Sequence, residues 1–188
     1  MTKLVLASAS PRRQQLLSQI GITPDAIQPA DIDETSLKGE QPRLYTERMG
    51  LEKAQAVHQK GQFTIAGDTV VSVGRRILPK AETEQEVIDC LKLMSGRAHH
   101  VMTSVCIIAP DGSIGQRLND TRVIMKRLSE DEIKAYLVCG EGIGKAGGYA
   151  IQGRAGAYIK QISGSYTGVM GLPVYETANL LTGLGYRL

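Results

Sequence analysis

The sequence predicts a mixed α/β domain, because short apolar runs with strand character alternate with segments of helical periodicity along the whole chain. Hydrophobic residues make up 42% and charged residues 22% of the 188 residues, a balance that is ordinary for a folded domain with a sizeable core. No internal repeat, linker or low-complexity tract divides the chain, so we expect one domain over residues 1–188.

The N-terminal half is predicted to alternate strands and helices. We expect a strand at 4–7, a helix that begins at Pro11, a weak strand at 26–28 and a long helix over 42–60. The apolar side of the long helix is assigned to Leu44, Met49, Leu51, Ala54 and Val57. Strand runs at 64–66 and 70–73 follow, interrupted by Gly67-Asp68-Thr69, and a turn at 74–76 leads back into Ile77-Leu78.

The C-terminal half continues this alternation. A helix is expected from Thr83 to Met94, ending at Gly96. A turn at Pro110-Asp111-Gly112 joins two long strands at 101–109 and 114–125. Ser129 and Glu132 match the capping box of a helix that ends at Gly140. An irregular glycine-rich stretch at 142–156, a strand at 157–162 and a last helix at 173–181 complete the prediction.

Charge and composition exclude several classes of partner. The net charge is only +3, with no basic tail and few aromatic residues, which argues against a nucleic-acid partner. No apolar run approaches the roughly 20 residues of a membrane helix, and no signal peptide is expected, so we expect no membrane partner. The cysteines, Cys90, Cys106 and Cys139, are scattered and odd in number, which predicts buried free thiols and a cytoplasmic location.

The connection between the first strand and the first helix suggests an anion site. Ser10 is predicted to be the N-cap and Pro11 the first helical residue. Arg12 and Arg13 then oppose the helix macrodipole, an arrangement that only an anion resting there would make favourable. With the hydroxyls of Ser8 and Ser10, they suit a phosphate. We favour a nucleotide or other polyphosphate over the alternative, a capped surface helix whose arginines point into water.

Asp68 interrupts an otherwise apolar strand. A carboxylate in such surroundings must be paired, metal-bound or functionally poised, although this residue alone fits better a strand-end aspartate in a turn. The predicted hairpin would bring Lys80 back near Asp68. Asp33 and Glu34 lie in an acidic loop that is solvated by default, yet with Asp68 they could hold Mg²⁺ or Mn²⁺.

Two further polar positions are less specific. Glu52-Lys53 is expected on an exposed charged face of the long helix, and the amide of Gln152 could contact a base edge. The stretch 142–147 matches G-x-G-x-x-G, but it follows a helix and lacks the accompanying acid, and it is not a P-loop. The histidines have no zinc spacing with the cysteines, and no G-x-S-x-G elbow is present. We therefore expect the general base to be a carboxylate or a metal-bound water.

Collinear short motifs resemble the Maf family over nearly the full chain. The matching motifs are Ser8-x-Ser10-Pro11-Arg12-Arg13, Asp33-Glu34, Lys53-Ala54, Gly67-Asp68-Thr69, Lys80, Leu93-x-x-Ser95-Gly96-Arg97, the stretch 147–153 and the stretch from Ser163 to Pro173. The resemblance implies an elongated, twisted mixed sheet with flanking helices and two lobes around a cleft. This fold is shared with inosine triphosphate pyrophosphatases, and family members often form dimers.

The resemblance also implies hydrolysis of a nucleoside triphosphate to its monophosphate and pyrophosphate, with a divalent cation, Mg²⁺ or Mn²⁺. Asp68 would be the general base or a metal ligand, Glu34 would assist the metal, and Lys80 would complete the catalytic set. Arg12, Arg13, Lys53 and Lys80 would hold the phosphates, with Ser8 and Ser10 beside them.

Base preference follows a finer resemblance. Arg12, Thr69 and Gln152 resemble the Maf subgroup that acts on dTTP and UTP. The alternatives are the subgroup acting on 7-methyl-GTP, another non-standard nucleotide, or a non-catalytic nucleotide-binding regulator of septum formation. Two positions depart from the family: Ala81 stands where a proline is usual, which predicts a looser loop at Lys80, and Gly144 stands where an aspartate is common.

Overall fold

The computed structural model describes residues 2–188. Its first elements in chain order are β1 (Leu4–Leu6), α1 (Pro11–Gln19), β2 (Ala26–Ile27), α2 (Pro42–Val57), β3 (Phe63–Val73), β4 (Arg76–Leu78), β5 (Lys80–Ala81) and α3 (Glu84–Met94). They are followed by β6 (Ala98–Ile108), β7 (Ile114–Met125), α4 (Glu130–Val138), β8 (Lys145–Ala146), the 3₁₀ helix η1 (Arg154–Tyr158), β9 (Ile159–Ser163), α5 (Tyr166–Met170) and α6 (Val174–Gly183).

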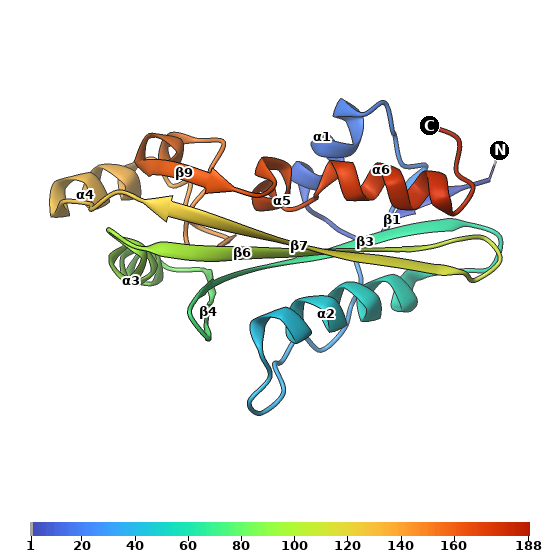
Figure 1. Ribbon diagram of the computed structural model, residues 1–188, viewed down its shortest axis with the longest axis horizontal. Coiled ribbons are helices and arrows are strands. Elements are labelled where there is room, and N and C mark those ends of the chain that lie inside the picture. The colour runs from blue at the N-terminus through green and yellow to red at the C-terminus, as the bar shows by residue number, and fades with distance from the viewer. Residues whose placement is uncertain (1) are drawn as a thin grey trace.

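One seven-stranded mixed sheet runs along the elongated molecule (Figure 1). Its strand order is β2-β1-β3-β6-β7-β9, and β4 pairs with β3 beside this path. β1 is parallel to both its neighbours, β2 and β3. The pairs β3–β6, β6–β7 and β7–β9 are antiparallel. The strands β3, β6 and β7 have 11, 11 and 12 residues. At about 3.3 Å per residue each spans about 35 Å, so these three strands join the two ends of the molecule.

Helices cover both faces of the sheet because side chains alternate between the faces along each strand. On one face α2 packs through Ala54 and Val57 against Val5, Ala66 and Ile108. On the other face Leu4, Leu6 and Ile65 pack with residues of α1 and α6, including Leu16, Leu17 and Leu181. Figure 1 shows α2 below the sheet and α1, α5 and α6 above it.

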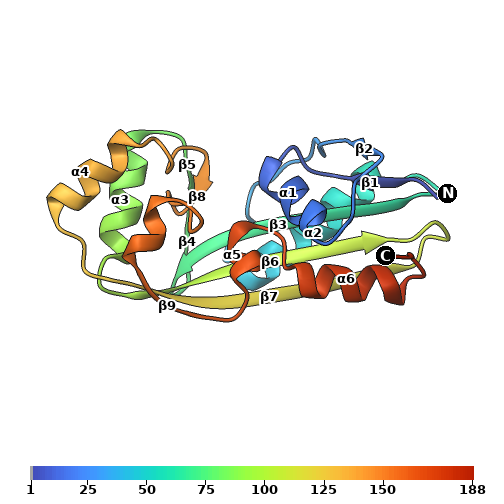
Figure 2. The same ribbon diagram turned by 90° about the horizontal axis from the view of Figure 1, so that it is seen from above.

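The flanking elements form two lobes on the shared long strands (Figure 2). β1, β2, α1 and both chain ends lie at one end. At the other end, α3 and α4 lie beside the small second sheet of β5 and β8. The predicted α/β class, with an elongated mixed sheet and two lobes, is therefore confirmed.

Three predictions about the middle of the chain were wrong. β3 is continuous through Gly67-Asp68-Thr69, because Asp68 pairs in register with Ser104 of β6 and its carboxylate has a buried cationic partner. The helix α2 ends at Val57 rather than at 60, and Leu44 is exposed. The buried face of α2 instead includes Thr46 and Lys53, whose polar groups are satisfied within the protein.

Other differences concern short elements and caps. β5, β8, η1 and α5 were not predicted, and the expected strand at 157–162 begins only at Ile159, after η1. Ser129 forms the predicted capping box, and Thr83 forms a second one with Glu86. Ser10 is the N-cap residue of α1, but its side chain makes no capping hydrogen bond in the described structure.

The cysteines are free, as predicted, but only Cys90 and Cys106 are buried; Cys139 is half-buried and its Sγ donates to the Tyr136 carbonyl. Within residues 2–188, none of the helices combines the length and the apolar character that crossing a membrane requires.

The contact between α2 and β6 generates a stability prediction. A Cβ at Gly50 of α2 would lie 2.5 Å from Ser104 Oγ and 3.0 Å from Ser104 Cβ. Gly50→Ala should therefore lower the free energy of unfolding by about 1–3 kcal/mol, measured by urea denaturation. The matched control is Gly183→Ala, where a Cβ meets nothing within 4 Å, so this change should be neutral or stabilise by up to about 1 kcal/mol. Equal effects of the two substitutions would contradict the close packing of α2 on the sheet.

Candidate active site

A cleft of about 740 Å³ lies between the two lobes, and ten site residues predicted from the sequence line it. These residues are Ser8, Ser10, Arg12, Arg13, Glu34, Lys53, Asp68, Thr69, Lys80 and Gln152. They come from the segment around the start of α1, the loop before α2, α2 itself, the long strand β3, β5 and the segment that follows β8. The fold therefore brings together residues that are distant in sequence.

Asp68 and Lys53 form a buried ion pair on one side of the cleft. The Lys53 ammonium lies 2.7 Å from Asp68 Oδ1 and 2.8 Å from Glu34 Oε2. The side chains of Lys53 and Asp68 are each only 11% exposed, whereas Glu34 is 53% exposed. The prediction of an exposed Lys53 was therefore wrong, and Asp68 pairs with Lys53, while Lys80 lines the same cleft. Burial of both charges is tolerable because each neutralises the other.

The loop that carries Glu34 is fastened to α2. Tyr45 Oη donates to the Glu34 carbonyl at 2.8 Å. Arg48 makes two 2.7 Å hydrogen bonds to the Glu40 carboxylate and a third, at 3.2 Å, to the Thr35 carbonyl. Burial, together with the charges of Asp68 and Glu34, raises the pKa of Tyr45 to about 12. This tyrosine therefore stays a neutral donor. Asp33 is exposed, accepts from Thr35 N in its own loop and does not line the cleft.

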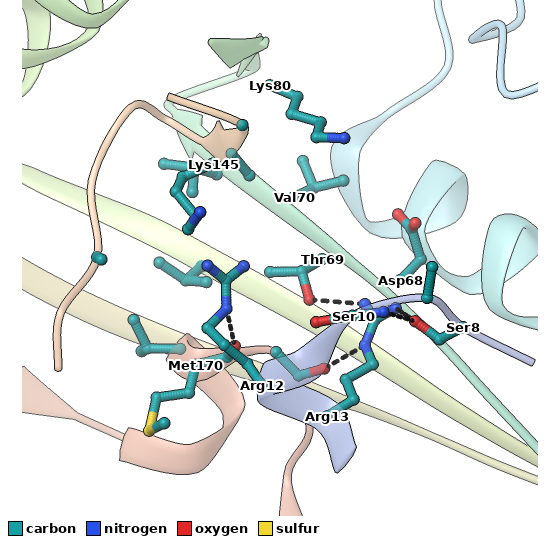
Figure 3. Close-up of a pocket in the computed structure, with 18 of the residues that line it drawn as sticks. Ser8, Ser10, Arg12, Arg13, Asp68, Thr69, Val70, Lys80, Lys145 and Met170 are labelled. Carbon is teal, nitrogen blue, oxygen red and sulfur yellow. Dashed lines mark hydrogen bonds between the residues drawn. The ribbon is translucent and has the colours of Figure 1, made fainter. Parts of the chain in front are cut away.

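Arg13 ties α1 to the rest of the site. Its Nε donates to the Gly171 carbonyl at 2.8 Å, Nη1 to Ser8 Oγ at 2.9 Å and Nη2 to Thr69 Oγ1 at 3.3 Å (Figure 3). A Cβ at Gly67 would lie 2.8 Å from the Ser104 carbonyl, so a glycine here permits the close approach of β6, and Arg13 Nε would lie 3.6 Å from that Cβ, at ordinary contact distance. Burial lowers the pKa of Arg13, and the charge of Asp68 opposes this effect.

Arg12 has a similar partner, because its Nε donates to the Met170 carbonyl at 3.1 Å. Met170 is the last residue of α5, so both arginines bind carbonyl groups at a helix C-terminus, where cations are favourable. The argument that only an anion could accommodate this arginine pair was therefore wrong. Local sequence could not reveal these carbonyl partners, because they lie 158 residues further along the chain.

The opposite side of the cleft is strongly cationic. Arg12, Lys80 and Lys145 all line it, and in the described structure none of them forms an ion pair with a carboxylate. Figure 3 shows Arg12 and Lys145 pointing into the same space, with Lys80 across from Asp68. Burial and the charges of Arg12 and Lys80 lower the pKa of Lys145. Three cations without an acidic partner suit an anion with several negative charges.

Lys145 was not predicted as a site residue, because the glycine-rich stretch around it was compared only with the G-x-G-x-x-G and P-loop motifs. It belongs to β8, which pairs with β5 so that Ala81 lies opposite Lys145 and Lys80 opposite Ala146. Ala81 is fully buried, and its carbonyl accepts from Gly144 N at 2.7 Å. The predicted loose loop at Lys80 is thus a paired strand, which corrects that expectation. Gly144 has φ +70°, a conformation that favours glycine.

The carboxylates suit a hard divalent cation. Oxygen atoms of Asp68 and Glu34, from separate elements, converge on a single positive group, the Lys53 ammonium. No cluster of three or more His, Cys, Asp or Glu side chains with metal-binding geometry occurs over residues 2–188. Mg²⁺ commonly uses one or two carboxylates and completes its shell with water and substrate phosphates, so two oxygen donors beside a cationic wall fit such an ion.

Fold and site together define an α/β protein whose inter-lobe cleft is built for a polyanionic ligand beside a buried carboxylate. The chain belongs to the Maf-like protein family, whose model matches residues 3–184. This confirms the family that the motifs resemble.

Similar proteins cover nearly the whole chain. A protein of Caulobacter vibrioides named dTTP/UTP pyrophosphatase is 59% identical over 98% of this chain and 96% of its own length. Proteins of the same name from Rhodopseudomonas palustris (strain HaA2) and Mesorhizobium japonicum are 55% and 52% identical, covering 99% and 100% of this chain and 94% of each relative. The solved structure of a HAM1 protein from Coxiella burnetii shares the fold, with a TM-score of 0.53 and 14% identity over 97% of this chain and all of that one.

The buried ion pair generates a second stability prediction. Lys53→Met would leave a buried carboxylate without its cation and should lower the free energy of unfolding by about 3–5 kcal/mol. Adding Asp68→Asn should recover part of this loss, because the double variant has no uncompensated charge at residue 68. Urea denaturation of the native protein, the two single variants and the double variant measures both effects.

Lys92→Met is the matched control, since Lys92 pairs with Glu130 where both side chains are more than half exposed. It should cost no more than about 1 kcal/mol. A Lys53→Met variant as stable as this control would show that the pair does not stabilise the fold.

Proposed function

We infer that this chain hydrolyses dTTP and UTP between the α and β phosphates, releasing the monophosphate and pyrophosphate. The observation that carries this inference is the cleft itself, in which three unpaired cations face a buried carboxylate in a chain 52–59% identical to dTTP/UTP pyrophosphatases. Phosphoryl transfer requires charge neutralisation and positioning more than covalent chemistry, and this cleft supplies both.

Asp68 is the group best placed to orient the attacking water. Its Oδ1 is held by Lys53 at 2.7 Å, and in the described structure its Oδ2 makes no hydrogen bond within the protein. Figure 3 shows the carboxylate pointing into the cleft toward the side of Lys80. We propose that Oδ2 takes a proton from water as the water oxygen attacks the α phosphorus. The bond from that phosphorus to the bridging oxygen then breaks, and pyrophosphate leaves with the bonding electron pair.

Arg12, Lys80 and Lys145 are proposed to hold the leaving pyrophosphate. Their positive charges oppose the negative charge that develops on the bridging oxygen, and Arg12 is fixed by the Met170 carbonyl. Arg13 has a different part, because its three donor nitrogens are engaged by Gly171, Ser8 and Thr69. We propose that it fixes the relative positions of α1 and β3.

We propose Mg²⁺ or Mn²⁺ as the cofactor, with Asp68 and Glu34 as its protein ligands. A bound divalent cation supplies further neutralisation of the phosphate oxygens.

We also propose that Gln152, exposed at the end of the cleft wall, contacts the base. Its amide offers both a donor and acceptors, which matches the N–H and carbonyl groups of uracil and thymine. A cytoplasmic location is proposed as well, where the free cysteines would stay reduced.

A nucleotide panel tests the reaction and its specificity. The protein should be incubated with Mg²⁺ or Mn²⁺ and dTTP, UTP, CTP, 7-methyl-GTP, ITP or the standard purine triphosphates, and the products separated. Monophosphate and pyrophosphate should form chiefly from dTTP and UTP. The same products mainly from 7-methyl-GTP or ITP would overturn the base preference, and nucleotide binding without turnover would favour a regulator.

Asp68→Asn should reduce kcat for dTTP by about 100-fold or more, since loss of a general base typically costs 10²–10⁴. The matched control is Asp33→Asn, which removes an exposed carboxylate outside the cleft and should leave kcat unchanged. Undiminished turnover by Asp68→Asn would remove this residue from the catalytic role.

A further inference from the structure

A buried His–Tyr pair lies behind one wall of the cleft. His99 of β6 is fully buried, and its Nε2 lies 2.8 Å from Tyr149 Oη. The two rings meet edge to face, with centroids 5.4 Å apart. Tyr149 lines the cleft, whereas His99 does not. The histidine therefore contacts a wall residue from behind, without reaching the ligand space.

Tyr149 belongs to the segment 144–152, which forms this wall. The segment begins with Gly144 and Lys145, ends with Gln152 and lines the cleft over most of its length. Its start is held by the pairing of β8 with β5, and Ala150 N donates to Tyr136 Oη at 3.1 Å. Between these two points the backbone turns through Gly147 and Gly148, both with φ +67°. Gly147 N donates to the Pro79 carbonyl at 3.0 Å, and the hydroxyl of Tyr149 adds a polar side-chain contact from this turn to β6.

The protonation of the pair follows from its surroundings. Burial lowers the pKa of His99 to about 4, and the charge of His100 adds to this effect, so the ring is neutral near pH 7. Burial likewise raises the pKa of Tyr149, which remains a hydroxyl donor. In the described structure His99 Nδ1 has no partner. The tautomer that leaves fewest polar groups unpaired has Tyr149 donating its proton to Nε2, so His99 serves as the acceptor that orients Tyr149.

We propose that His99 is a positioning residue, which through Tyr149 holds the second half of the 144–152 wall so that Gln152 meets the nucleotide. The proposal rests on the proposed function, since it assumes a nucleoside triphosphate in this cleft. Asp68, Lys53 and Glu34 lie on other elements and are not held by the pair, and Lys145 is held by the pairing of β8 with β5. Loss of the contact should therefore weaken nucleotide binding and base selection, with much less effect on the hydrolytic step.

The test measures binding and turnover separately. Binding is the Kd of a non-hydrolysable α,β-imido analogue of dUTP, measured by calorimetry. Turnover is measured as kcat and KM for dTTP and CTP. His99→Phe keeps a ring in the core but removes the acceptor, and it should raise both Kd and KM for dTTP about tenfold, with kcat within about threefold. The preference for dTTP over CTP should fall as well.

Two further variants separate positioning from general destabilisation. Tyr149→Phe should weaken binding as His99→Phe does, and the double variant should be no worse than either single variant, because both remove the same hydrogen bond. His99→Gln, which retains an acceptor, should recover at least part of the affinity. The control is His100→Gln on the same strand, whose partner is the partly exposed Asp120 and whose loss should leave Kd unchanged.

Several outcomes overturn the proposal. One is an unchanged Kd in a folded His99→Phe or Tyr149→Phe variant, and another is strictly additive losses in the double variant. If His99→Phe does not fold, Tyr149→Phe and His99→Gln decide by the same measurements. A native protein that binds the analogue but does not hydrolyse dTTP would refute the proposed function, while the Kd series would still test the role of His99.

Discussion

The site depends on one ionic contact, between the Lys53 ammonium and the Asp68 carboxylate. It places a carboxylate in the middle of the long strand β3, where an unpaired charge would be too costly to bury. For Lys53 to reach Asp68, α2 must lie close against the sheet, and Gly50 permits this approach. The pair thus connects the packing of α2, the loop of Glu34 and the carboxylate proposed to orient water.

The cationic side chains around this pair fall into two groups, one that binds other parts of the protein and one that faces the ligand space. Arg13 is occupied by acceptors of the protein and joins α1, β3 and the end of α5. Arg12, Lys80 and Lys145 lack acidic partners in the described structure and face the ligand space. The carbonyl groups at the end of α5 stabilise both arginines, which allows a cationic cleft to persist without a ligand. Cations from both lobes can therefore act on one polyphosphate.

Sequence reasoning succeeded where the signal was local or came from collinear motifs. Turn residues, capping boxes and apolar runs located the main helices and strands, and the family motifs identified ten residues that share one cleft. It failed where a distant contact decides the outcome. Lys53 was assigned to an exposed face because periodicity considers apolar residues and cannot reveal a buried ion pair. The carbonyl partners of Arg12 and Arg13, and the β5–β8 pairing that presents Lys145, likewise arise only from tertiary structure.

The most direct test of this account is a crystal structure of the protein with the α,β-imido analogue of dUTP and Mg²⁺. The account predicts phosphate oxygens on Arg12, Lys80 and Lys145, the α phosphorus facing Asp68 across a water molecule, and the base beside Gln152. A triphosphate bound outside the cleft, or a base placed among the three cations with the phosphates directed away from Asp68, would contradict it.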